Sequence, residues 1–149
     1  MKIVANSGNE RVIDILKASL HRGCRVDLAT NDVSLFAFGE LYQTLEQCTH
    51  VNLLFASQAA LREDTLTLGN PFLGSVAERL YRNRLESAWL AKRMEAWWSK
   101  RGIIRWLVAR LPQATIIIRD QREEPILALV GACPFSTEGL GLTPGNRYG

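Results

Sequence analysis

The residues that could do chemistry gather in two short segments of the C-terminal half. They are Gln113, Thr115 and Asp120, followed by Gly131, Pro134 and Ser136. A glutamine amide does not titrate near neutral pH and is a poor nucleophile, and a threonine hydroxyl brings no fixed charge. Asp120 is therefore the one member of this set that could exchange a proton, and alone it forms no acid–base pair.

Both segments resemble the signature of phospholipase D-like proteins. Residues 113–120 are similar to the pattern His-x-Lys-x-x-x-x-Asp, and residues 131–136 to the Gly-Ser-x-Asn-Phe-Thr that follows it. In that family two His side chains attack phosphorus and protonate the leaving oxygen, while Lys and Asn hold the anionic oxygens. Gln113, Thr115 and Pro134 replace the His, the Lys and the Asn, so the resemblance implies a degenerate active site. A second alignment, which matches Arg119 to an arginine of an earlier strand, also leaves no His–Lys pair.

Further stretches are similar to the amino-terminal phospholipase D-like domains of bacterial helicases in restriction and phage-defence systems. They are residues 2–6, 14–20, 26–30, 34–38, 51–55 and 135–140. The resemblance implies an α/β fold, with a phospholipase D-like mixed, largely parallel sheet flanked by helices, in one domain over residues 1–149. It also implies a helicase module in the same or a neighbouring polypeptide. The sequence leaves open whether the chain is a fragment of a longer protein.

The hydrophobic pattern independently favours this fold class. Apolar runs at 3–4, 25–30 and 51–56 alternate with helical periodicity over 12–20 and 35–45, which is typical of a parallel sheet covered by helices. Asp32 or Ser34 can cap the second helix. A loop from residue 57, a long helix from about 71 to 101, a short helix over 103–111 and a hairpin of strands at 114–118 and 126–130 complete the prediction.

The length and composition of the chain restrict the class of protein to which it can belong. With 149 residues, 47% apolar and 22% charged, the chain has the make-up of one soluble globular domain. No run approaches the roughly 18 apolar residues that a membrane span needs, and the first residues lack the apolar core of a signal peptide. We therefore expect a cytoplasmic protein.

The cysteines suit a reducing compartment. There are three, Cys24, Cys48 and Cys133, which is an odd number at wide spacing and argues against a disulfide framework. His21 and His50 lie near the first two and complete a possible zinc-ligand set, but Cys-x-His is tighter than the usual ligand spacing. We expect buried core thiols, and no metal or other cofactor.

Basic charge is concentrated in the long helix. Residues 79–110 hold nine basic and two acidic residues, a net charge of +7, which leaves −4 for the rest of the chain. Arg82, Arg93 and Lys100 fall within about 20° of one another on a helix, with Trp89 close beside them. This stripe could bind DNA or RNA through backbone phosphates and a stacked base. The alternative interpretation is a solvated helix face.

The same helix carries two apolar faces, one of which would pack on the sheet. The first face comprises Tyr81, Leu85, Ala88 and Trp89. The second comprises Leu90, Met94, Trp97 and Trp98, and it is our candidate for a homodimer interface. Its alternative partners lie within the chain, at Ile103, Trp106 and Leu107. If neither arrangement holds, the region around Thr115 and Phe135 is the next candidate for the contact between copies.

The sequence thus favours a catalytically degenerate phospholipase D-like domain that acts as a nucleic-acid-binding or assembly module in a helicase or restriction-type system. Two alternatives remain. One is a phosphodiesterase or nuclease with altered active-site residues, using Asp120. The other is a protein-interaction module that uses the Trp-rich helix.

We predict no hydrolysis of bis-nitrophenyl phosphate or plasmid DNA, with or without divalent metal, because the nucleophile and the phosphate-holding groups are missing. Gln113→His with Thr115→Lys returns two of these groups and is the comparison for weak restored activity. Turnover above buffer by the wild-type chain that disappears in Asp120→Ala would contradict the prediction.

Overall fold

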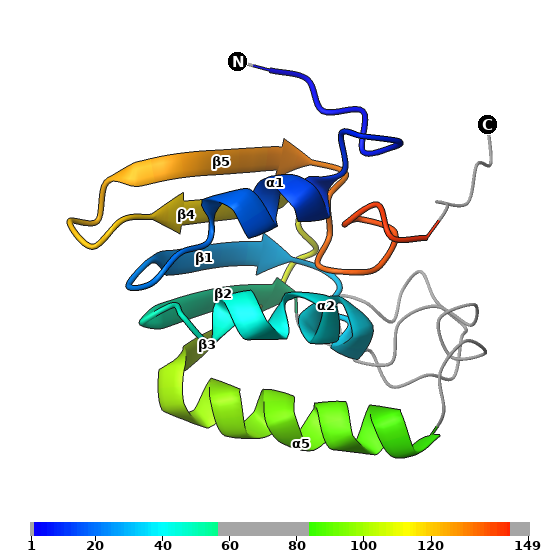
Figure 1. Cartoon of the computed structure of the whole chain (residues 1–149), viewed down its shortest axis with the longest axis vertical. Coiled ribbons are helices and arrows are strands. Elements are labelled where there is room, and N and C mark those ends of the chain that lie inside the picture. The colour runs from blue at the N-terminus through cyan, green and yellow to red at the C-terminus, as the bar shows by residue number, and fades with distance from the viewer. Residues whose placement is uncertain (1, 57–83, 144–149) are drawn as a thin grey trace.

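The computed structural model describes residues 2–56 and 84–143. Helices and strands alternate along most of this part of the chain (Figure 1). In order they are α1 Val12–Ser19, β1 Arg25–Thr30, α2 Leu35–Leu45, β2 His50–Ala56, α5 Arg84–Arg101, β3 Gly102–Leu107, β4 Ala114–Arg119 and β5 Pro125–Gly131. No helix in these two ranges is both long and apolar enough to cross a membrane.

The strands form one five-stranded mixed sheet in the order β3-β2-β1-β4-β5. Strands β1, β2 and β3 run parallel, whereas β4 is antiparallel to β1 and β5 is antiparallel to β4. Helices α1 and α2 lie over one face of this sheet, and α5 lies beside α2 (Figure 1). The predicted α/β class, with a mixed sheet flanked by helices, is confirmed.

Two predicted elements are wrong. The run Ile3-Val4 is not a strand, and the exposed side chain of Ile3 makes no core contact that would favour one. The short helix expected over residues 103–111 is replaced by strand β3, which ends at Leu107. Its isoleucines and its tryptophan have high β propensity, and parallel pairing with β2 satisfies its backbone groups, so the tertiary partner overrides the local helical spacing.

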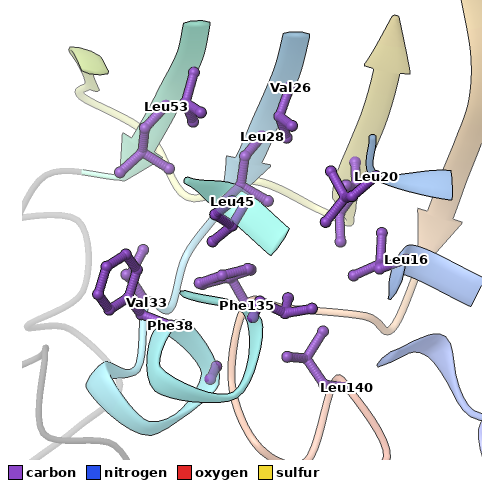
Figure 2. Packing of buried hydrophobic residues seen from close by; sticks show 14 of the residues in the cluster. Leu16, Leu20, Val26, Leu28, Val33, Phe38, Leu45, Leu53, Phe135 and Leu140 are labelled. Carbon is purple, nitrogen blue, oxygen red and sulfur yellow. The ribbon is translucent and has the colours of Figure 1, made fainter. Parts of the chain in front are cut away.

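The core lies between the sheet and the helices. Strands β1, β2 and β4 bury every second side chain, as expected for strands covered on one face. Figure 2 shows Val26, Leu28 and Leu53 of the sheet pointing toward Leu45 of α2. Phe135 and Leu140, from the segment after β5, join the same cluster.

Side-chain hydrogen bonds fix the starts of α1 and α2. Ser34 caps α2, because its hydroxyl accepts hydrogen bonds from the Phe36 and Ala37 amides at 3.2 and 3.4 Å. The Asn6 side chain accepts one from the Val12 amide at 2.9 Å and donates one to the Gly139 carbonyl at 3.0 Å. One asparagine therefore joins the start of α1 to the C-terminal segment.

The apolar face predicted as a homodimer interface is covered within the chain. Leu90, Met94 and Trp97 are 4%, 8% and 6% exposed and pack against α2. The Trp97 ring lies 5.3 Å from the Phe38 ring, and its Nε1 donates to the Leu45 carbonyl at 3.4 Å.

The other residues of the two predicted helix faces differ in burial. Trp98 is half-buried, with its ring 5.4 Å from that of Trp97. Ala88 and Trp89 of the other face are exposed, while Tyr81 and the Leu85 side chain lie outside the described residues. Because both faces are apolar in sequence, composition did not determine which of them α2 would cover.

The two tryptophans provide a matched test of this packing. Trp97→Ala should lower the free energy of unfolding by about 3 to 5 kcal/mol, since it leaves a cavity between α5 and α2. Trp89→Ala should cost less than about 1 kcal/mol, because that ring is 52% exposed. Urea unfolding followed by circular dichroism measures both, and equal losses would contradict the arrangement.

Candidate functional site

The first group of signature-like residues is spread along β4. Gln113 is exposed just before the strand, and the Thr115 side chain lies on the sheet face opposite the helices. Asp120 follows the other end of the strand, in the turn between β4 and β5. Its Oδ1 accepts hydrogen bonds from the Arg122 and Glu124 amides at 2.8 and 2.9 Å. Asp120 thus organises a hairpin turn, and a whole strand separates it from Gln113.

The second group lies at the opposite end of the hairpin and attaches a loop to β1. Gly131 ends β5 with a φ of +138°, a conformation that favours glycine. Pro134 precedes Phe135, whose amide donates to the Thr30 hydroxyl at 3.3 Å and whose carbonyl accepts from the Ser34 amide at 2.8 Å. The Ser136 hydroxyl accepts from the Gly139 amide at 3.1 Å. These contacts hold the loop against the C-terminal end of β1.

The geometry brings part of the signature together but gives it no catalytic chemistry. Thr115 and Gly131 lie near the paired ends of β4 and β5, because Ala114 pairs with Gly131. The side chain of Asn31 bonds both backbone groups of Leu111, at 2.8 and 2.9 Å, and so fixes the chain just before Gln113. The neutral groups gathered at this edge provide neither a nucleophile with a base nor a cation for phosphate.

The sheet face opposite the helices carries a hydrogen-bonded group of polar side chains outside the signature-like residues. We call this surface the open face. Its side chains, taken from the strand registers, are Asp27, Ala29, Asn52, Leu54, Ile103, Arg105, Thr115, Ile117, Ala128 and Val130. No other part of the described chain forms a layer over this face.

Asp27 is the centre of that polar group. It accepts from the Arg119 Nε at 2.8 Å and from the Asn52 Nδ2 at 2.7 Å. Burial alone would raise the pKa of Asp27, but these two hydrogen bonds and the nearby charges of Arg119 and Arg25 outweigh it. The pKa therefore lies below its ordinary value, and the carboxylate stays charged on a largely apolar surface.

A shallow hollow of about 240 Å³ adjoins Asp27 on the open face. Asn52, Arg105 and Thr115 contribute polar groups to its wall, and Ile103 and Ile117 contribute apolar ones. The Arg105 guanidinium is exposed and has no partner among the described residues. Thr115 is thus a signature-like position that lines a hollow with both charged and apolar side chains.

The predicted nucleic-acid stripe is partly assembled. The Arg93 guanidinium lies 4.7 Å from the Trp89 ring and 5.0 Å from the Tyr42 ring, and it donates to the Tyr42 hydroxyl. Lys100 is exposed further along α5, and Arg82 lies outside the described residues. A groove of about 520 Å³ beside Trp89 holds Lys17 together with Glu40. This mixture of charges is less favourable for phosphate than a purely basic surface.

Two of the four zinc-ligand candidates come together. The Cys24 and Cys48 sulfurs are 2.8 Å apart in the core. The exposed His21 ring bonds the Ser19 carbonyl at 3.1 Å, and His50 begins β2 on the same face as Asn52. Within the residues described, no group of three or more possible metal ligands occurs.

Sequence reasoning missed the Asp27, Asn52 and Arg119 group. The alternation within residues 25–30 and 50–56 does place Asp27 and Asn52 on the polar side of their strands. What makes them neighbours is the strand register, in which Asp27 pairs with both Asn52 and Ile117. The alternation in the sequence fixes the face on which each side chain lies, but not which residue of the neighbouring strand it pairs with.

Comparison with protein-family models, with curated proteins and with solved structures finds no match for this chain.

Asp27→Asn should lower the free energy of unfolding at neutral pH by about 1 kcal/mol. This is below the usual range of about 1.5 to 3 kcal/mol for hydrogen bonds to charged groups, because the Asp27 and Arg119 side chains are 31% and 33% exposed to solvent screening. Since the folded pKa is depressed, the contribution is complete above the unfolded pKa of about 3.9 and is lost as the pH falls through the folded pKa. Urea unfolding of both proteins at neutral pH and near pH 2 measures the difference in their free energies of unfolding. A difference that is the same at both pH values would contradict this role of Asp27.

Proposed function

We propose that this chain is a non-catalytic, phospholipase D-like assembly module that pairs with a second copy of itself through the open face of its sheet. The resemblance of the sequence to helicase-associated domains supports a place in a helicase or restriction-type system. The observation that carries the proposal is the sheet face that residues 2–56 and 84–143 leave uncovered, which presents apolar side chains around the charged Asp27 and Arg119 pair.

Exposed apolar side chains lie along both edges of this face. Ile103 on β3 is 42% exposed, and Ile126 and Val130 on β5 are 48% and 65% exposed. Large exposed apolar surfaces on soluble proteins commonly mark interaction sites. Because β3 and β5 are the outer strands, apolar surface reaches from one side of the face to the other.

The size of the face suits a weak dimer. Five strands about 4.8 Å apart and about six residues long span roughly 24 by 20 Å, or about 500 Å². Two such faces in contact bury about 1,000 Å², which is the low end for specific protein interfaces. Contacts of this size are commonly transient, so we expect a measurable equilibrium between monomer and dimer at micromolar protein concentrations.

The face also has the charge pattern that a two-fold contact needs. In an isologous interface the same surface must be complementary to itself. Asp27 and the unpartnered Arg105 lie on one face, so the carboxylate of one copy can meet the guanidinium of the other. The predicted alternative contact around Thr115 and Phe135 overlaps this surface at Thr115, whereas Phe135 is buried in the core.

Neighbouring isoleucines on β3 offer a matched test. Ile103 lies on the open face and Ile104 on the opposite one, with 42% and 39% exposure. Ile103→Glu should weaken self-association at least about tenfold, because it places a carboxylate in the contact, while Ile104→Glu should leave it near the wild-type value. Sedimentation equilibrium over a concentration series gives both constants. A strictly monomeric wild-type chain at tens of micromolar, or equal effects of the two substitutions, would contradict the proposal.

Nucleic-acid binding along α5 is a second candidate function, favoured by the Trp89 and Arg93 stack and the exposed Lys100. Contacts to backbone phosphates give affinity that falls steeply with salt and depends little on base sequence. Fluorescence anisotropy with labelled single-stranded and duplex oligonucleotides should show such binding, weakened in Arg93→Ala with Lys100→Ala. Binding that the double variant leaves unchanged would remove this candidate.

A further inference from the structure

Two thiols meet in the core at the start of the parallel strands. Cys24 directly precedes β1, Cys48 lies two residues before β2, and their sulfur atoms are 2.8 Å apart. Both side chains are buried, at 0% and 1% exposure. Neither takes part in the signature-like residues or in the open face, so the proposed function leaves this contact unexplained.

The backbone holds the two cysteines side by side. The Thr49 amide donates to the Cys24 carbonyl at 2.9 Å, and the Gly23 amide donates to the Gln47 carbonyl at 2.9 Å. These two bonds join the segments that lead into β1 and β2 on either side of the cysteine pair. Arg101 adds a third anchor, since its guanidinium donates to the Cys48 carbonyl at 3.1 Å. A disulfide needs sulfurs about 2.05 Å apart, so the two atoms have less than about 1 Å to move.

We propose that Cys24 and Cys48 are a redox-active dithiol that is reversibly oxidised to an internal disulfide joining the starts of β1 and β2. The oxidant is a small-molecule disulfide of the glutathione type. The third cysteine, Cys133, is buried in the segment after β5 and remains a free thiol.

The reaction proceeds in two exchanges. Because both sulfurs are buried, the reaction begins when a local opening of the segment before β1 exposes Cys24. The Cys24 thiolate then attacks one sulfur of the oxidant, which forms a mixed disulfide and releases the first small thiolate. Cys48 then loses its proton and attacks the Cys24 sulfur, which forms the internal disulfide and releases the second small thiolate. Each released thiolate takes up one of the two protons that the cysteines give up, so the protein loses two hydrogens and the oxidant gains them.

The opposite shifts in the pKa values of the two thiols indicate which cysteine attacks the oxidant and which resolves the mixed disulfide. The hydrogen bond from Cys48 lowers the pKa of Cys24 to about 6, and the backbone and charge of His21 act in the same direction, against the effect of burial. The bond to Cys24 and burial both raise the pKa of Cys48, while the Arg101 charge opposes them. Cys24 is therefore the attacking thiolate, and Cys48 is the thiol that resolves the mixed disulfide.

Thiol mapping of the native wild-type chain tests the proposal. The protein is incubated with oxidised glutathione, quenched by alkylation in denaturant, digested without reduction and examined by mass spectrometry. The expected product is a Cys24–Cys48 linked peptide with Cys133 alkylated, and dithiothreitol should return three alkylated cysteines. The oxidised protein should also unfold at a higher temperature than the reduced protein, because a covalent tie restricts the unfolded chain.

Variants separate the pair from general thiol oxidation. Cys133→Ala should still form the linked peptide, and Cys48→Ala should not gain thermal stability on oxidation. A wild-type chain that keeps three free thiols after prolonged treatment, or one that becomes modified at Cys133 instead, would overturn the proposal. So would a linked peptide joining two copies of the chain, which a mixture of isotopically light and heavy protein reveals.

Discussion

The structure depends on a sheet that the described part of the chain covers on one side only. Every second residue of β1, β2 and β4 points into one hydrophobic layer, which α1, α2 and the Met94 and Trp97 side chains of α5 fill. The asymmetry fixes the strand register, because a shift by one residue would turn the buried set outward. It also leaves a second face on which Asp27 is held charged by Arg119 and Asn52.

The signature-like residues Asp120 and Ser136 have structural roles in the turns beside the sheet. Asp120 closes the β4–β5 turn, and Ser136 caps the turn that leads to Leu140. Both roles need side-chain oxygens at particular places in the chain, and neither needs a catalytic partner. The position of the Asp120 carboxylate, one strand length after Thr115, is therefore explained by the hydrogen bonds that it accepts in the turn. The hairpin forms with Gln113 and Thr115, and neither a His nor a Lys is needed at these positions to hold it.

Much of the fold could be predicted from local pattern, because the amphipathic period of each central element is clear. Strands β1, β2, β4 and β5 and helices α1 and α2 lie where alternation and capping residues place them. Strand β3 was missed because the five residues after Gly102 fit a helix as well as a strand, and only pairing with Val51–Ala56 decides. The buried side of α5 was likewise ambiguous, since tryptophan and leucine occur on both of its faces. The Asp27 group and the Cys24–Cys48 contact depend on strand register, which a single sequence does not encode locally.

The claim that the open face makes the contact between copies can be tested by photo-crosslinking. A benzophenone amino acid replaces Ala128, which is exposed on the open face, or Ala96, which is exposed on α5 away from it. Irradiation at tens of micromolar should give a covalent dimer from the Ala128 position and little or none from Ala96. A dimer formed mainly through Ala96, or from neither position, would contradict the account.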